Sequence, residues 1–167
     1  MKLIILDRDG VLNEDSDDYV KSVDEWLPII GSAQAVGRLC AAGYTVTVAT
    51  NQSGLGRGFF SQNDLDAMHA KMIRLANAEG GQFAHIAYCP HSPDDHCDCR
   101  KPLPGLIDQI RQALNVSSED LSRAYMVGDS IRDLEAGVAA GCQPVLVRTG
   151  KGQQSEAKLP SHERLAT

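Results

Sequence analysis

The chain of 167 residues lacks several features that would place it in a broad class of proteins. It has no run of basic residues, since 16 Lys and Arg are outnumbered by 22 Asp and Glu and the formal net charge is −6. A nucleic acid or a membrane surface is therefore not an expected partner, although a local positive pocket is compatible with this charge. No apolar stretch approaches the roughly 20 residues that a membrane-spanning helix needs.

A signal peptide and disulfide bonds are also not expected. The first residues, MKLIILD, meet an aspartate after four apolar residues, which is too short for the apolar region of a signal peptide. We therefore expect a cytoplasmic protein whose five cysteines stay reduced, three of them within residues 89–99. With 43% hydrophobic residues, the chain is long enough for one domain over residues 1–167 but not for two.

Short apolar segments alternate with amphipathic segments along the chain, without internal repeats. The expected strands are residues 2–6, 44–50, 84–89, 124–128 and 144–148. The expected helices are residues 32–42, 62–79, 104–114 and 131–140, the second of which begins with a Ser61–Asp64 capping box. Residues 150–167 are expected to form a polar tail. This alternation predicts an α/β fold with a doubly wound, mainly parallel sheet and helices on both faces.

Acidic residues follow two of the predicted strands. Asp7 and Asp9 come after the first strand, Thr50 and Asn51 close the second, and Asp129 follows the fourth. In such sheets, ligands bind beyond the carboxyl ends of the strands, so these groups should share one edge. Carboxylates this close repel each other unless a divalent cation lies among them, and Mg2+ prefers such oxygen ligands. A bound phosphate would complete the coordination shell.

The spacing Asp7-x-Asp9 can support the hydrolysis of a phosphate monoester in two steps. One carboxylate attacks phosphorus and forms an aspartyl-phosphate. The second protonates the leaving alkoxide and later takes a proton from water. The Thr50 hydroxyl, the N–H of Asn51 and the ammonium of Lys101 are candidates to stabilise the phosphoryl oxygens.

Four motifs, DRDG, ATNQSG, CRKP and GDSIRD, span residues 7–133 in an order that resembles the haloacid dehalogenase phosphatase superfamily. The resemblance implies that Asp7 is the nucleophile, Asp9 the general acid and base, and Thr50 and Lys101 the phosphoryl stabilisers. It also implies Mg2+ at Asp7, Asp129 and the backbone carbonyl of Asp9. Only about 25 residues separate the first strand from the first helix, so we expect no cap domain of the kind that many relatives carry.

A second metal site is indicated by the segment CPHSPDDHCDCRKP. Three soft thiolates and an imidazole match a tetrahedral Zn2+ site with no open position, so the zinc would be structural. His96 is a possible competing ligand, and free thiols in a flexible loop are the alternative. The site would fix Arg100 and Lys101, which follow it directly. The expected ligands are Cys89, His91, Cys97 and Cys99.

Within the superfamily, a zinc loop of this form resembles two groups, the heptose bisphosphate phosphatases and the histidinol-phosphate phosphatases. The segment TNQSGLGRGFF (50–60) is more similar to the heptose group, since the histidinol group resembles NQDGLG there, and VRTGKG (147–152) is also similar to the heptose group. We therefore expect removal of the 7-phosphate of a heptose bisphosphate in lipopolysaccharide precursor synthesis. Histidinol phosphate is the alternative, and the acidic residues in 14–18 would suit its ammonium.

The same resemblance implies a substrate-facing flap at residues 15–19 and contacts from the second strand's end. Position 130 departs from the pattern, because many heptose phosphatases have lysine there, and Ser130 removes one phosphate-binding charge. We keep Asp133 as a supporting residue and interpret it mainly as a helix cap with Ser130. The implied substrate-binding residues are Asp15, Ser16, Asp18, Tyr19, Asn51, Gln52, Ser53, Arg100 and Ser130.

Two alternatives without turnover remain. A phospho-accepting signalling domain also combines acidic residues, a threonine and a lysine, but it would not need Asp9 after the phosphate-accepting aspartate. A zinc-organised interaction module with an inactive site is the other. Sustained Mg2+-dependent phosphate release would exclude both. We expect a monomer that acts on a small sugar phosphate.

Overall fold

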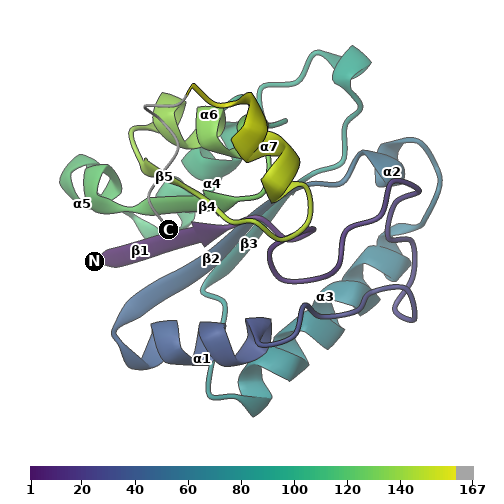
Figure 1. The fold of residues 1–167 in the computed structure, drawn as a ribbon, viewed down its shortest axis with the longest axis horizontal. Coiled ribbons are helices and arrows are strands. Elements are labelled where there is room, and N and C mark those ends of the chain that lie inside the picture. The colour runs from purple at the N-terminus through teal and green to yellow at the C-terminus, as the bar shows by residue number, and fades with distance from the viewer. Residues whose placement is uncertain (161–167) are drawn as a thin grey trace.

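The computed structural model describes residues 1–160, which fold around one parallel sheet with strand order β3-β2-β1-β4-β5 (Figure 1). The chain adds β2 and β3 on one side of β1 and then returns to place β4 on the other side. This reversal opens a crevice beyond the carboxyl ends of β1 and β4, where such sheets bind ligands. The strands are β1 (Lys2–Leu6), β2 (Tyr44–Asn51), β3 (His85–Cys89), β4 (Tyr125–Gly128) and β5 (Gln143–Leu146).

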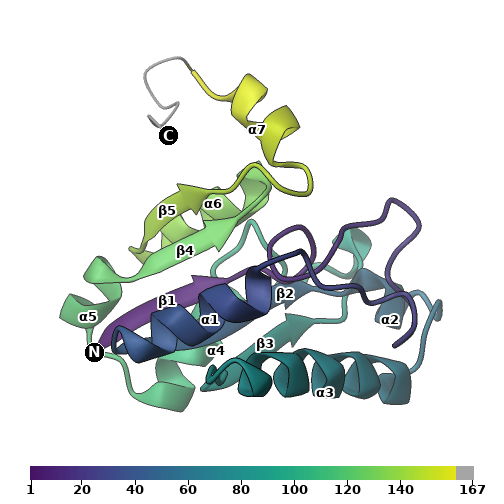
Figure 2. The same cartoon turned by 60° about the horizontal axis from the view of Figure 1, so that its bottom comes forward.

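Helices cover both faces of the sheet (Figures 1 and 2). α1 and α3 pack on one face, while α4 and α6 pack on the other. The helices are α1 (Ser32–Ala41), α2 (Ser53–Gly56), α3 (Gln62–Ala78), α4 (Gly105–Leu114), α5 (Ser118–Arg123), α6 (Ile131–Ala140) and α7 (Gly152–Lys158), with a 3-10 turn at Pro93–Asp95. The predicted α/β class with a parallel, doubly wound sheet is confirmed.

The central strand explains why the sheet is covered twice. Side chains alternate along β1, so Leu3 and Ile5 enter the core under α4 and α6, whereas Ile4 and Leu6 enter the core under α1 and α3. All four are buried, and each fully buried side chain of this size contributes about 1.5–3 kcal/mol. An unbroken apolar strand therefore requires a helical layer on each side.

The predicted polar tail is wrong for residues 152–158, which form α7. Its sequence, GQQSEAK, has no apolar stripe from which a helix could be predicted. Polar contacts hold it instead: the Ser155 hydroxyl donates to the carbonyl of Asp129 at 2.7 Å, and Arg148 forms an ion pair with Glu156 at 2.8 Å. The rest of the predicted tail, residues 161–167, lies outside the described residues.

The segment between β1 and α1 forms turns and isolated bridges, at Asp9 with Asn13 and at Asn13 with Pro28, rather than a further layer. This agrees with the expectation that no cap domain is inserted here. Within residues 1–160, no helix is both long and apolar enough to cross a membrane.

Candidate active site

An open cavity of about 260 Å³ lies beyond the carboxyl ends of β1, β2 and β4. Most of the residues predicted for the site line it, although they come from segments far apart in the sequence. These are Asp7, Asp9, Asp15, Ser16, Tyr19, Asn51, Gln52, Ser53, Arg100, Lys101, Asp129 and Ser130. Five further residues also line it, namely Asp17, Val20, Arg132, Asp133 and Lys151.

Two predicted residues do not line the cavity. Thr50 is buried behind Gln52, whose amide donates to the Thr50 hydroxyl at 3.0 Å. Asp18 is exposed, and its backbone N–H donates to the Ser16 hydroxyl at 3.2 Å. Its neighbour Asp17 faces the cavity instead.

The ammonium of Lys101 is buried and held by three acceptors. It lies 2.9 Å from Oδ1 of Asp7, 2.7 Å from Oδ1 of Asp133 and 2.7 Å from the carbonyl of Ala49. Burial opposes the charge, but the Asp133 and Asp7 carboxylates outweigh it and raise the pKa of Lys101. Asn51 also fixes the lysine backbone through hydrogen bonds of 3.0 and 3.1 Å. Lys101 is therefore a fixed positive charge beside Asp7.

Three buried carboxylates, Asp7, Asp129 and Asp133, offer oxygens within 4.8 Å of one another. Burial and the neighbouring charge of Asp133 raise the pKa of Asp7 and of Asp129, despite Lys101 beside Asp7. One ammonium cannot balance three carboxylates, so the ionised forms need a further cation. Both Asp133 oxygens already have donors, whereas no side chain among residues 1–160 donates to Oδ2 of Asp7 or Oδ1 of Asp129. These hard oxygen donors fit Mg2+.

Two glycines leave room for the Asp129 carboxylate. Gly10 and Gly150 have φ angles of +86° and +56°, which favour glycine, and a Cβ at either position would overlap that carboxylate. The backbone N–H of Lys151 donates to Oδ2 of Asp129 at 2.9 Å. The loop before α7 therefore closes over Asp129, and no apolar pattern in the sequence indicated this contact.

The Asp9 carboxylate is held on both oxygens and remains about one quarter exposed. Oδ1 accepts from Nη2 of Arg8 at 2.8 Å and from Nδ2 of Asn13 at 2.8 Å, while Oδ2 accepts from Nε2 of Gln52 at 3.0 Å. Burial opposes ionisation, but the Arg8 charge and these hydrogen bonds outweigh it and lower the pKa of Asp9. Gln52 was predicted to contact the substrate, whereas here its amide orients Asp9.

The segment of residues 15–19 forms one wall of the cavity. Tyr19 has a φ of +66°, which is uncommon for a residue with a side chain and marks a constrained position. Its ring packs on Phe59 with centroids 5.2 Å apart, and its hydroxyl accepts from Ser53 at 3.5 Å. Asp15 lies 3.6 Å from the ammonium of Lys151. This wall therefore contacts the segment after β2 as well as the loop before α7.

Arg57, Arg100 and Arg132 form a group of like charges. Arg100 is half-buried, and burial together with the charges of Arg132 and Arg57 lowers its pKa. Within the described part of the chain, no carboxylate forms an ion pair with any of the three. Arg100 and Arg132 line the cavity. Such a group of like charges favours an anion.

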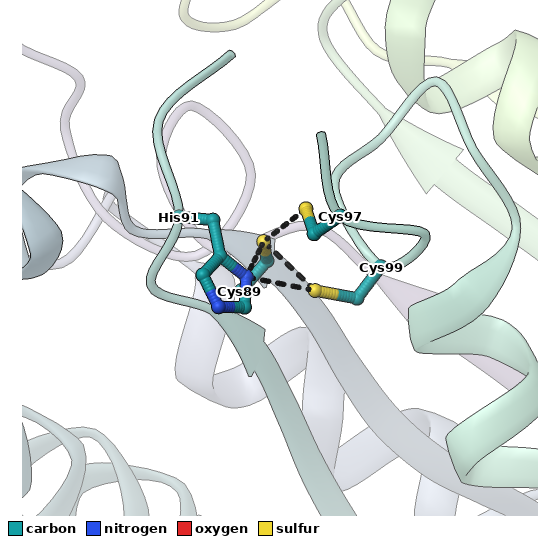
Figure 3. Close-up of side chains that lie close together, drawn as sticks. All are labelled: Cys89, His91, Cys97 and Cys99. Atoms are coloured by element: carbon teal, nitrogen blue, oxygen red, sulfur yellow. Dashed lines mark hydrogen bonds between the residues drawn. The ribbon is translucent and has the colours of Figure 1, made fainter. Parts of the chain in front are cut away.

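A second cluster, at the end of β3, brings together the four residues predicted to bind zinc (Figure 3). Nδ1 of His91 lies 3.5 Å from Sγ of Cys89 and 3.4 Å from Sγ of Cys99. Sγ of Cys89 lies 3.6 Å from Sγ of Cys97. Tetrahedral Zn2+ with bonds of about 2.0–2.3 Å places its ligands about 3.5–3.8 Å apart, which these three separations approach, whereas Sγ of Cys99 lies closer to Sγ of Cys89, at 3.0 Å. Three thiols and one imidazole are a donor set that suits this ion. His96 is exposed and outside the cluster.

The cluster also favours ionisation of one thiol. Burial opposes this, but the backbone N–H of Arg100 and the thiols of Cys89 and Cys99 lower the pKa of Cys97 to about 7. Ionised thiols are the form that binds metals. Because Lys101 follows directly, the cluster and the lysine share one short segment.

Three contributions to the site were not predicted from the sequence. Asp133 was predicted as a supporting residue whose main role is to cap the helix, and it does accept from the Ser130 N–H at 3.1 Å, but its ion pair with Lys101 was not predicted. Arg132 lies in the fourth motif, GDSIRD, and Lys151 lies in VRTGKG. Neither residue was assigned a role from the sequence. Their long side chains reach the cavity from outside the strands.

Comparison with known proteins places these observations in a family. A family model described as HAD-hydrolase-like matches residues 98–166. The D-glycero-β-D-manno-heptose-1,7-bisphosphate 7-phosphatase of Pseudomonas aeruginosa is 56% identical over 156 residues, covering 93% of this chain and 86% of that protein. The phosphatase of the same name from Neisseria meningitidis is 53% identical over 169 residues, which cover 99% of this chain and 89% of that protein.

Solved structures agree with this similarity. The crystal structure of D,D-heptose 1,7-bisphosphate phosphatase from B. bronchiseptica, complexed with magnesium and phosphate, matches with a TM-score of 0.92. The two chains are 52% identical, and the match covers 99% of this chain and 92% of the other.

Proposed function

Because this chain belongs to the D-glycero-β-D-manno-heptose-1,7-bisphosphate 7-phosphatase family, within the haloacid dehalogenase superfamily, we propose that it removes the 7-phosphate of that sugar bisphosphate. The chain is a hydrolase, and the prediction of the heptose group rather than the histidinol group is confirmed. The observation that carries the proposal is a cavity lined by two neighbouring carboxylates, Asp7 and Asp9, together with the cations Lys101, Arg100 and Arg132.

Asp7 is the proposed nucleophile. Its Oδ1 accepts from Lys101 at 2.9 Å and from the backbone N–H of Arg8 at 2.8 Å, which fixes the plane of the carboxylate. The carboxylate attacks phosphorus, the bond between phosphorus and the sugar oxygen breaks, and an aspartyl-phosphate forms. Lys101 stabilises the charge on the phosphoryl oxygens.

Asp9 is the proposed general acid and base. Arg8 and the hydrogen bonds lower the pKa of Asp9 in the protein alone, but the negative charge of a bound phosphate ester raises it, so Asp9 enters the first step protonated. It then gives its proton to the departing alkoxide of the sugar. In the second step the resulting carboxylate takes a proton from water, which attacks phosphorus and releases phosphate and free Asp7. The exposed part of Asp9 faces the cavity, as both steps require.

The second phosphate of the substrate meets Arg100 and Arg132. A bisphosphate carries two dianions, and Arg100 and Arg132, which line the cavity without an ion-pair partner among residues 1–160, supply positive charge in addition to that of Lys101. Arg132 lies two residues after Ser130. Many relatives are expected to have lysine at position 130. The guanidinium of Arg132 supplies the cation that Ser130 lacks.

Both predicted metals have suitable donors. Asp7 and Asp129, with the carbonyl of Asp9, would hold Mg2+, as the magnesium-bound relative supports. When bound, Mg2+ neutralises the phosphoryl oxygens and keeps the carboxylates ionised. The cysteine and histidine cluster would hold a structural Zn2+ that fixes the segment before Lys101.

The test compares kcat/KM for heptose 1,7-bisphosphate and histidinol phosphate in the presence of Mg2+. We expect the heptose substrate to be preferred by more than about tenfold, with heptose 1-phosphate identified by phosphorus NMR. A preference for histidinol phosphate would show that the proposed substrate is wrong, but it would remain compatible with the proposed aspartyl-phosphate mechanism. Asp7→Asn should remain folded and lose turnover, and mass spectrometry of quenched wild-type enzyme should find the phosphoryl group on Asp7. Turnover by Asp7→Asn would contradict the assignment of Asp7 as the nucleophile.

A further inference from the structure

We propose that Arg8 and His69 are positioning residues for Asp9. His69 accepts a hydrogen bond from Arg8, and this contact sets the guanidinium so that it binds one oxygen of the Asp9 carboxylate and leaves the other for proton transfer. The inference rests on the proposed function, because it takes Asp9 to be the general acid and base.

The Arg8 side chain is completely buried although it carries a charge. A buried charge is costly unless it is paired and hydrogen-bonded, so its partners constrain it strongly. Its Nε and Nη2 donate to Oδ1 of Asp9 at 3.2 and 2.8 Å, and its Nη1 lies 3.3 Å from Nε2 of His69. In residues 1–160, no other side chain accepts from this guanidinium. Its orientation therefore depends on two groups.

His69 is suited to accept this hydrogen bond. It lies in the middle of α3, is buried, and packs at the edge of the Tyr88 ring with centroids 6.2 Å apart. Burial and the Arg8 charge lower its pKa to about 4, so the imidazole is neutral near pH 7. A neutral imidazole can accept at Nε2 when its proton is on Nδ1. A protonated imidazole could not.

The consequence falls on the two oxygens of Asp9. Oδ1 receives three donors, two from Arg8 and one from Asn13, whereas Oδ2 receives only the Gln52 amide. Negative charge is therefore stabilised on Oδ1, and Oδ2 is the oxygen that carries the transferable proton. Without His69, the guanidinium could rotate and the two oxygens would lose this difference.

The test uses two substrates that differ in their need for an acid. The alkoxide of heptose bisphosphate requires a proton, whereas the nitrophenolate of p-nitrophenyl phosphate departs without one. We compare kcat/KM, because it excludes the later hydrolysis of the aspartyl-phosphate, in which Asp9 serves both substrates. His69→Leu should lower kcat/KM for the alkyl substrate by about tenfold or more, and for the aryl substrate by less than about threefold.

Two variants separate positioning from packing. His69→Gln keeps an acceptor and should retain most of the wild-type ratio between the substrates. Met72→Ala opens space on the same buried face of α3 and leaves both hydrogen-bond partners of Arg8 in place, so it should lower thermal stability and leave the ratio unchanged. A parallel loss for both substrates in His69→Leu, or no loss at all, would overturn the proposal.

A second measurement does not depend on turnover. Nitrogen NMR of the wild-type protein at pH 7 should find Nε2 of His69 without a proton, with the signal assigned by its absence in His69→Gln. An N–H at Nε2 would contradict the proposed hydrogen bond. If histidinol phosphate proves the better substrate, the proposed substrate fails, but the ratio measured with that alkyl phosphate still decides the role of His69.

Discussion

Asn51 and Lys101 are joined by a reciprocal pair of hydrogen bonds. The side-chain amide of Asn51 donates to the Lys101 carbonyl at 3.1 Å, and the Lys101 N–H donates to the Asn51 side-chain oxygen at 3.0 Å. Asn51 is the last residue of β2, so the sheet fixes the backbone of the lysine. The cysteine and histidine cluster precedes the lysine directly in the chain, and a zinc ion bound there would be a second support for the charge beside Asp7.

Asn51→Ala removes one of these supports. Two hydrogen bonds at about 0.5–1.5 kcal/mol each predict a fall in kcat of about tenfold or more, since the lysine is no longer held beside Asp7. Steady-state kinetics with saturating Mg2+ checks this. Asn63→Ala changes an exposed residue of α3 and should retain wild-type kcat. An unchanged kcat in Asn51→Ala would mean that the other contacts suffice.

Asp133→Asn tests the buried ion pair with Lys101. Removing one charge from a buried pair costs about 3–5 kcal/mol, so both stability and kcat should fall. Ser130→Ala removes only the hydroxyl that donates to Asp133 at 3.0 Å, and should cost about 1 kcal/mol with little change in kcat. Denaturant unfolding and kinetics measure the two effects. Equal losses in both variants would show that capping is the main role of Asp133.

Gly150→Ala tests the closure of the loop over Asp129. A Cβ there would displace the carboxylate, so the Mg2+ concentration for half-maximal activity should rise by about tenfold or more. Gly80→Ala has a similar φ of +79° but open space around it, so it should cost only about 1–2 kcal/mol of stability. If both variants require the same Mg2+ as the wild type, the loop does not control the metal.

Cys97→Ser tests the metal cluster. We expect the purified variant to contain less zinc, to have a lower Tm and to lose activity, because the segment before Lys101 is no longer fixed. Elemental analysis and calorimetry provide the measurements. Cys40→Ser is the matched control, since this thiol lies outside the cluster and contacts Gln82. Full activity in zinc-free Cys97→Ser would separate the metal from catalysis.

The stability of the protein should depend on pH through His69. Burial and Arg8 lower its pKa from 6.5 to about 4, although the Asp9 and Asp66 carboxylates oppose this. Between these values the unfolded state binds more protons, so the free energy of unfolding falls as the pH falls from 6.5 toward 4. The slope is at most about 1.4 kcal/mol per pH unit.

Urea unfolding from pH 4.5 to 7.5 measures this slope. His69→Gln should reduce it, and His96→Gln, which changes an exposed residue, should keep it. A wild-type slope in His69→Gln would assign the pH dependence to other groups.

The larger elements were predictable because each carries a hydrophobic period. The strands of apolar residues and the α3 stripe with its Ser61–Asp64 capping box appear within two residues of the expected bounds. α7 was not predictable, since polar contacts between distant segments hold it to Asp129. The short helices α2 and α5 likewise have too few residues for a periodic pattern.

The site was predictable where strand ends supply it. Parallel strands bring their carboxyl ends to one edge, so Asp7, Asp9 and Asp129 could be grouped from the sequence alone. The side chains that pair with these residues could not be predicted in this way. The pairing of Lys101 with Asp133 joins two separate motifs, and the contact between Arg8 and His69 joins the edge of the sheet to the middle of a helix.

The central position of β1 in the sheet has a consequence for the solubility of the chain during its synthesis. This strand, KLIIL, leaves the ribosome before the other four strands, and β4 (Tyr125–Gly128), which pairs with one of its edges, follows more than 100 residues later. Until then an apolar strand keeps an unpaired edge, which is a template for aggregation. Ribosomes that pause before residue 125 should therefore yield insoluble chains, whereas a pause after residue 128 should be tolerated better.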